Sequence, residues 1–137
     1  MANSIDYQVT EEGPRNAVVK LTGYLDTSNV SELPAIPLSV FVNNDTRMNL
    51  VGLRVDLLEW AISSGIEVQL SWNSSNPQQM FPLSGRGRIN STNYGGFIPD
   101  RTRGGYTGDI NLVTTGYPAG SIQNFSIVLE LIKLYSV

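Results

Sequence analysis

Hydrophobic and polar residues alternate one by one along much of this chain. Between residues 66 and 72, the apolar residues Ile66, Val68, Leu70 and Trp72 are separated by single polar residues. Successive side chains of a β-strand point to opposite faces, so this period of two is typical of a strand with one buried face. The same pattern predicts strands over residues 5–10, 17–25 and 107–116.

The segment 48–62 is the one place where a helix and a strand compete. Leu50, Leu53, Leu57 and Trp60 have helical spacing, but the residues at 53, 55 and 57 also alternate as in a strand. Gly52 and the β-branched valines weaken a helix, so we predict a strand. The Ser-Ser-Gly sequence at 63–65 then suits a hairpin to residues 66–72, with Trp60 and Trp72 in the same half of the protein.

The other segments are assigned by their breaks and their apolar runs. Residues 26–37 contain two prolines and no helical period, which indicates an extended connection along a sheet edge. Residues 38–45 predict a short strand, 83–90 a strand weakened by glycine, and 91–106 a long loop. Residues 122–136 are apolar on both alternating faces, which predicts a central strand covered on both sides.

Together these elements predict an all-β protein. We expect a single domain spanning 1–137, folded as a β-sandwich of jelly-roll or Greek-key type with about eight strands and at most one short helix. An up-and-down barrel is the alternative way to close the sheet. Residues 1–14 and 26–37 are candidates for extended arms that add a strand to the sheet of a neighbouring molecule.

Composition narrows the function classes. Of 137 residues, 15% are charged against about 25% in typical domains, and the chain has no cysteine and no histidine. Disulfides, thiolate metal sites and the commonest general base are therefore excluded. A net charge of -3 with two lysines argues against nucleic-acid binding. The N-terminus lacks a secretory signal and no apolar run is long enough to cross a membrane, so we expect synthesis in the cytoplasm and no membrane partner.

The acidic residues offer little chemistry. The closest suggestive pairs are Asp56 with Glu59 and Asp100 with Asp109, which we interpret as residues of exposed strand faces and turns. The composition leaves open a calcium site built from Asp, Asn and backbone oxygens, and its candidate ligands are Asn43, Asn44 and Asp45, or Asp109 and Asn111. Because Asn and Asp clusters more often make turns, we expect no metal site. We also expect no catalytic residue and no cofactor, and we do not expect an enzyme.

Arginine, glycine and aromatic residues are concentrated between residues 85 and 106. A phosphate-binding loop would need a Lys-Ser/Thr pair and a following helix, and the sequence has neither here. Because arginine and aromatic residues are enriched at protein interfaces, we predict a protein contact, with a solvated flexible loop as the alternative. The candidate interface residues are Arg86, Arg88, Tyr94, Phe97, Arg101, Arg103 and Tyr106. Trp60 and Trp72 could stack on a sugar, but their register favours packing in the core.

Four segments resemble a known group of proteins: VDLLEWAISSGIEVQLSWN (55–73), PLSGRGRIN (82–90), GGYTGDINLVTTGY (104–117) and FSIVLELIKL (125–134). Their order is similar to that in capsid decoration (cement) and other small virion structural proteins of tailed bacteriophages. The resemblance implies a non-enzymatic protein, made in the host cytoplasm, that binds the major capsid protein on the outside of the phage head as a homo-oligomer, with a trimer expected. The alternative is a tail- or fibre-associated adhesion module that binds glycans.

Overall fold

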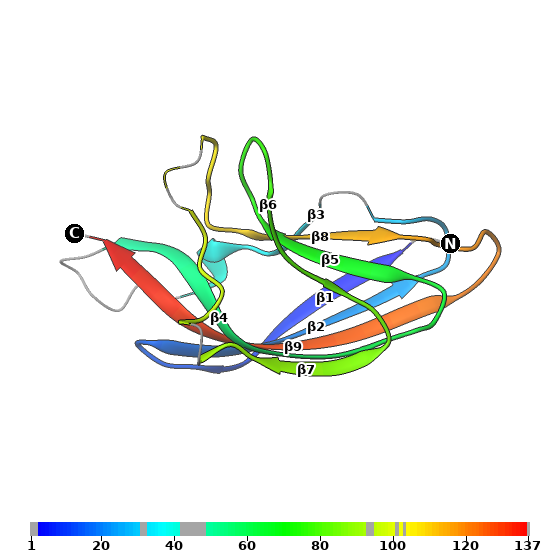
Figure 1. Ribbon diagram of the computed structural model, residues 1–137, viewed down its shortest axis with the longest axis horizontal. Coiled ribbons are helices and arrows are strands. Elements are labelled where there is room, and N and C mark those ends of the chain that lie inside the picture. Colours follow the sequence, from blue (N-terminus) through cyan, green and yellow to red (C-terminus); the bar gives the residue numbers. More distant parts are fainter. Residues whose placement is uncertain are drawn as a thin grey trace.

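The computed structural model describes residues 3–30, 33–41, 49–92, 95–100, 102 and 104–136. Within these residues the chain forms two antiparallel sheets that face each other, as the upper and lower layers of Figure 1 show. The strands are β1 (Ser4–Glu12), β2 (Asn16–Leu25), β3 (Leu33–Ile36), β4 (Asn49–Ile62), β5 (Glu67–Trp72), β6 (Gln78–Leu83), β7 (Arg86–Asn90), β8 (Ile110–Thr115) and β9 (Gln123–Ser136). One turn of 3-10 helix, η1 (Leu38–Val40), lies between β3 and β4.

The strand order is that of a jelly roll. The larger sheet has the order β1-β2-β9-β4-β7 and the smaller one β3-β8-β5-β6. After β2 the chain passes from sheet to sheet at every connection except the β5–β6 hairpin, so that β2 to β9 wrap around one core. This confirms the predicted sandwich of jelly-roll type. Strand β1 adds a fifth strand at the margin of the larger sheet.

The core lies between the two sheets and is built by the predicted alternation. From the larger sheet, Leu21, Leu58 and Leu129 are fully buried, and they face Leu70 and Leu112 of the smaller sheet. Trp72 belongs to this core, and its indole Nε1 donates to the carbonyl oxygen of Leu53 at 3.2 Å. Trp60 is half-buried at the margin of the core, and its Nε1 donates to the carbonyl of Ser84 at 3.0 Å. Core packing is therefore confirmed for Trp72, whereas Trp60 packs at the margin with its ring 6.4 Å from that of Phe81.

The predicted strand at 48–62 is confirmed as β4, but its predicted hairpin with β5 is wrong. β4 pairs with β9 and β7, whereas β5 pairs with β6 and β8 in the opposite sheet. Residues 63–66 form a corner that is fastened to the start of β9: the Ser63 amide donates to Asn124 O at 3.0 Å and the Ser63 hydroxyl to Gln123 Oε1 at 2.7 Å. Trp60 and Trp72 therefore lie in different sheets.

Two shorter predictions also differ from the structure. Residues 38–40 form a 3-10 turn instead of a strand, because the amide of Val40 donates back to Pro37 and that of Leu38 to Asp109 Oδ1; residues 42–45 lie outside the described part. The predicted strand 83–90 is divided between the end of β6 and β7. The division falls at Gly85, whose φ of 63° is a left-handed conformation that glycine adopts without steric cost.

The segments predicted to lie at sheet edges or to form arms differ in how they pair. Within 26–37, β3 pairs with β8 at the margin of the smaller sheet, as the two prolines indicated. Residues 4–12, by contrast, do not form a free arm, because β1 is paired with β2 over its whole length. The described part of 91–106 contains no strand. It is attached to β4 by one isolated backbone bridge, Val55–Phe97, and by side-chain hydrogen bonds from Ser91 and Tyr106.

Candidate functional site

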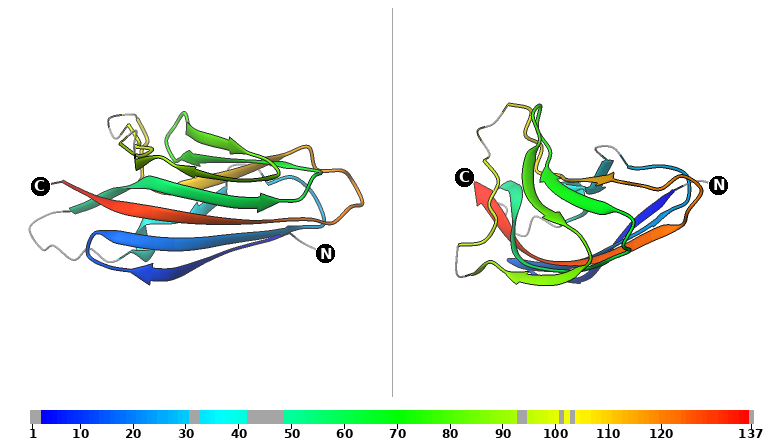
Figure 2. Two further views of the ribbon diagram at one scale, coloured as in Figure 1. Left: turned by 60° about the horizontal axis from the view of Figure 1, so that its bottom comes forward. Right: turned by 45° about the vertical axis from the view of Figure 1, so that its right-hand side comes forward.

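The outward side of the larger sheet is not covered by any other element among the described residues. β9 is the central strand of this sheet, as predicted, but only its Phe125, Ile127, Leu129 and Leu131 side is buried. The prediction that both of its sides are covered is wrong, because no second layer packs outside this sheet within the described residues (Figure 2). We call this side the outer face.

The strand registers place side chains from five strands on the outer face. One row across the sheet contains Gln8, Lys20, Val128, Glu59 and Arg88, and the next contains Asp6, Thr22, Ser126, Ala61 and Arg86. Val128 is half-buried in the middle of its row, and Arg88 and Glu59 form a loose ion pair of 3.7 Å at the margin. The apolar centre is extended by Val18 and Ile132, which are also half-buried. The face thus has a weakly apolar middle and charged margins.

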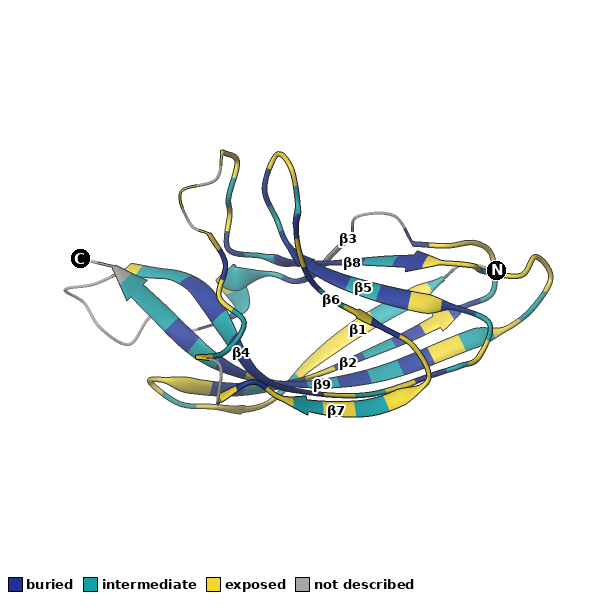
Figure 3. Cartoon of the chain, in the orientation of Figure 1, coloured by how far each residue is buried: buried dark blue, intermediate teal, exposed yellow. Residues whose placement is uncertain are grey.

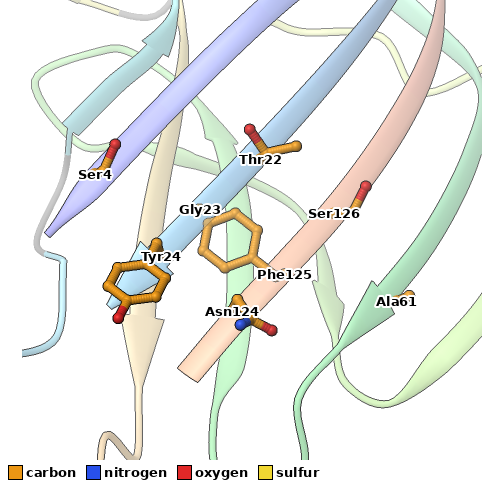
Figure 4. Close-up of a pocket in the computed structure, with 8 residues that line it drawn as sticks. All are labelled: Ser4, Thr22, Gly23, Tyr24, Ala61, Asn124, Phe125 and Ser126. Atoms are coloured by element: carbon orange, nitrogen blue, oxygen red, sulfur yellow. The ribbon is translucent and has the colours of Figure 1, made fainter. Parts of the chain in front are cut away.

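A shallow hollow of about 420 Å³ lies at one end of the outer face. Tyr24 of β2 and Asn124 of β9 are register partners at its end, and Thr22 and Ser126 form the next pair (Figure 4). The hollow exists because the side chains of Thr22, Ala61, Asn124 and Ser126 that line it are small. A Cβ at Gly23 would overlap the ring of Phe125, which packs under this position from the core. Tyr24 remains 36% exposed and presents a ring beside an amide and two hydroxyls.

A smaller hollow of about 200 Å³ lies on the outward side of the smaller sheet. Its lining carries no charge and comprises Gln69, Ser71, Asn76, Pro77, Gln79 and Val113. The side-chain amides of Gln79 and Gln69 interact at 3.3 Å, and the Ser71 hydroxyl is buried with no hydrogen-bond partner among the described residues.

The described members of the predicted interface occupy two different environments. Arg86 and Arg88 are exposed on β7, at the margin of the outer face. Phe97 and Tyr106 instead hold the loop onto the sandwich: the Phe97 ring lies 5.9 Å from that of Phe81, and the Tyr106 hydroxyl donates to the carbonyl oxygen of Val51 at 3.0 Å. The other candidates, Tyr94, Arg101 and Arg103, lie outside the described residues.

The acidic candidates stabilise local structure. Asp56 makes a two-point contact with Arg54, with N–O distances of 2.8 and 3.2 Å, and Asp100 Oδ1 accepts from the amide and hydroxyl of Thr102. Asp109 accepts from the Leu38 amide and from the Thr107 hydroxyl. Among the described residues no three acidic side chains gather as a metal site would require.

Of the calcium candidates, Asn43, Asn44 and Asp45 lie outside the described residues. Asn111 is buried, and its amide donates to Asn73 Oδ1 at 3.0 Å.

Comparisons with known proteins leave the function open. No protein-family model matches the chain, and no curated protein does. A solved structure titled "CBM4 structure and function" aligns over 96% of this chain and 93% of its own, with 7% identity and a TM-score of 0.28. A likeness at that level carries no argument about what this chain binds. No helix among the described residues is both long and apolar enough to cross a membrane.

Proposed function

We propose that this protein is a non-enzymatic structural component of a tailed-phage virion, attached to the outer surface of the head and stabilising it. The observation that carries the proposal is the outer face: an open sheet surface with Val128 and Ile132 near its middle and Lys20, Glu59 and Arg88 around them. Protein–protein interfaces have this arrangement, with an apolar core and a polar rim. The resemblance of segments 55–73, 82–90, 104–117 and 125–134 to capsid decoration proteins supplies the partner, the major capsid protein.

The physical demands on such a protein agree with the rest of the molecule. A capsid offers many equivalent binding positions, so a modest contact area at each is enough for stable attachment of an oligomer. The jelly roll provides a rigid frame, but it also occurs in lectin domains, so the fold alone does not decide the function. Of the acidic residues that the sequence suggested as a pair, Asp56 is engaged with Arg54 and Glu59 with Arg88.

The test uses one substitution on each outward side of the sandwich. Val128 on the outer face and Val113 on the opposite side are both half-buried strand residues. We expect Val128→Asp to weaken binding to purified heads lacking this protein at least about tenfold, because a charge would be desolvated inside the interface. Val113→Asp should bind like the wild type. Co-sedimentation with heads measures both, and equal binding of the two variants would remove the outer face from the proposal.

The hollow beside Tyr24 supports a second candidate, glycan binding by an adhesion module. An exposed aromatic ring next to Asn124, Thr22 and Ser126 can stack on a sugar and hydrogen-bond its hydroxyls (Figure 4). On a glycan array, Tyr24→Ala should abolish binding and Tyr24→Phe should preserve it if this candidate is correct. Array binding together with no association to heads would replace the capsid proposal by this one.

A further inference from the structure

The four edge strands of the sandwich are protected to very different degrees. Open sheet edges pair readily with other chains, and proteins protect them with short strands, proline or inward and outward charges. β3 has four residues and contains Pro34, β6 contains Pro82, and β7 has five residues with two arginines. β1 has nine residues and contains neither proline nor a basic residue; its charges are Asp6 and, beyond a register shift after Val9, Glu11 and Glu12. Among the described residues its backbone pairs with β2 alone, and it forms the free lower margin in the left view of Figure 2.

This long edge strand also carries an apolar strip that the sandwich covers only in part. Ile5, Tyr7 and Val9 are register partners of Gly23, Leu21 and Val19, so they lie on the core side of the larger sheet. The smaller sheet has one strand fewer and leaves the strip at its margin. Ile5 and Val9 are half-buried, but Tyr7 is 41% exposed, and β1 is mostly exposed in Figure 3. A neighbour at this edge would cover the ring of Tyr7.

The sequence of β1 is complementary to itself in the antiparallel direction. If two copies pair about Tyr7, Ile5 lies opposite Val9, Tyr7 opposite Tyr7 and Asp6 opposite Gln8. Directly opposed residues of an antiparallel pair share one face of the sheet, so the apolar strips of both copies join on the core side. On the other side the carboxylate of Asp6 lies directly opposite the amide of Gln8, and the two Asp6 carboxylates are diagonal neighbours, so no like charges lie directly opposite each other. Glu11 and Glu12 lie beyond the pairing, after a register shift that follows Val9.

We propose that this chain forms a two-fold dimer in which β1 of one copy pairs with β1 of a second copy through residues 4–10. The two larger sheets then form one continuous sheet, and the exposed edge and the Tyr7 ring are both covered. The occupant is a second copy because Ile5, Tyr7 and Val9 are matched by the same three residues in the antiparallel direction, which joins the two apolar strips. The dimer uses the margin of the sheet and leaves the outer face open, so it is independent of attachment to a phage head.

The first experiment compares two tyrosines by sedimentation equilibrium. We expect the wild type to reach twice the monomer mass with rising concentration. Tyr7→Lys should raise the dissociation constant at least about tenfold, because the pairing would place two ammonium groups on Cβ atoms about 4.5–5.5 Å apart. Tyr24→Lys is the matched control: Tyr24 is 36% exposed on the neighbouring strand but points to the outer face, so this variant should dimerise normally. Circular dichroism checks that all three proteins are folded.

The second experiment uses the absence of cysteine from the chain. Antiparallel partners have Cα atoms about 4.5–5.5 Å apart, which lies within the range for a disulfide. Under mild oxidation Tyr7→Cys should therefore form a covalent dimer in high yield, and Tyr24→Cys should not. A wild type that is monomeric at every concentration, a trimeric mass, or equal cross-linking of the two cysteine variants would each overturn the proposal.

Discussion

The ion pair between Lys133 and Glu12 is a feature of the core that the alternation of apolar and polar residues does not predict. The alternation places Lys133 on the buried side of β9, and its side chain is fully buried with Nζ 2.7 Å from Glu12 Oε2. A buried ammonium is tolerated only when a partner compensates its lost hydration. The two residues are separated by 121 positions, so no local pattern could have linked them.

We predict that Glu12→Gln destabilises the protein by about 3 kcal/mol. This is the low end of the range for breaking a buried pair, because Glu12 keeps 22% of its side chain in solvent. The exposed neighbour is the control, and Glu11→Gln should change the free energy of unfolding by less than about 0.5 kcal/mol. Lys133→Met should cost less than Glu12→Gln, because it removes the fully buried ammonium and leaves the Glu12 carboxylate, which solvent reaches in part. Urea denaturation followed by circular dichroism measures all three. Equal stability of Glu12→Gln and Glu11→Gln would contradict the account.

At the scale of the elements, alternation predicted which segments are strands better than it predicted their partners. The strands β2, β4, β5, β8 and β9 follow from the period of two, because a half-buried strand requires it whatever lies beside it. The hairpin between β4 and β5 failed because residues 63–66 turn toward β9, through contacts of Ser63 with residues about 60 positions away. β6 was missed because its first residues, Gln78 and Gln79, are polar.

The candidate surface was also visible in the sequence but was misinterpreted. The second side of residues 126–134, with Val128, Ile132 and Leu134, is apolar, and we took this as a sign of a covering layer. In the structure these residues are half-buried on the outer face. Apolar residues on one side of a strand do not require a covering layer from the same chain, because they also occur on protein surfaces and in interfaces with partners. The Arg-rich segment was chosen by composition alone, and Phe97 and Tyr106 prove to be engaged by the sandwich.

The link between the long loop and β4 permits a prediction at the level of one element. Ser91 is fully buried, and its hydroxyl lies 2.8 Å from Val55 O and 2.9 Å from Asp56 O, at the point where the β4 register shifts. We expect Ser91→Ala to cost about 1 kcal/mol, the usual net value of a hydrogen bond, because both carbonyls retain backbone partners. Amide exchange of Phe97 should accelerate more than that of Leu129. The exposed control Ser64→Ala should alter neither quantity, and uniform acceleration in Ser91→Ala would show that the effect is not local.

For the whole molecule, the jelly-roll connections predict that the two sheets unfold together. Trp60 reports on the larger sheet and Trp72 on the smaller one, and the chain crosses between the sheets so often that neither sheet consists of contiguous sequence. Both sheets share one core cluster. In Trp60→Phe and in Trp72→Phe, the fluorescence of the remaining tryptophan should therefore follow the same urea transition as the far-ultraviolet circular dichroism.

Leu129→Ala extends this test. The substitution removes core side-chain volume from the larger sheet, and the resulting loss of stability should also be detected in the smaller sheet. Leu129 is fully buried on the central strand, so the substitution should cost about 2–5 kcal/mol. Introduced into Trp60→Phe, it should lower the midpoint reported by Trp72 as much as the midpoint of the circular dichroism. If Trp72 kept its original midpoint, the smaller sheet would be stable without the larger one. The larger sheet, whose outer face contains Val128, could then unfold while the smaller sheet stays folded. A sheet that unfolds separately would not hold a binding surface in a fixed shape.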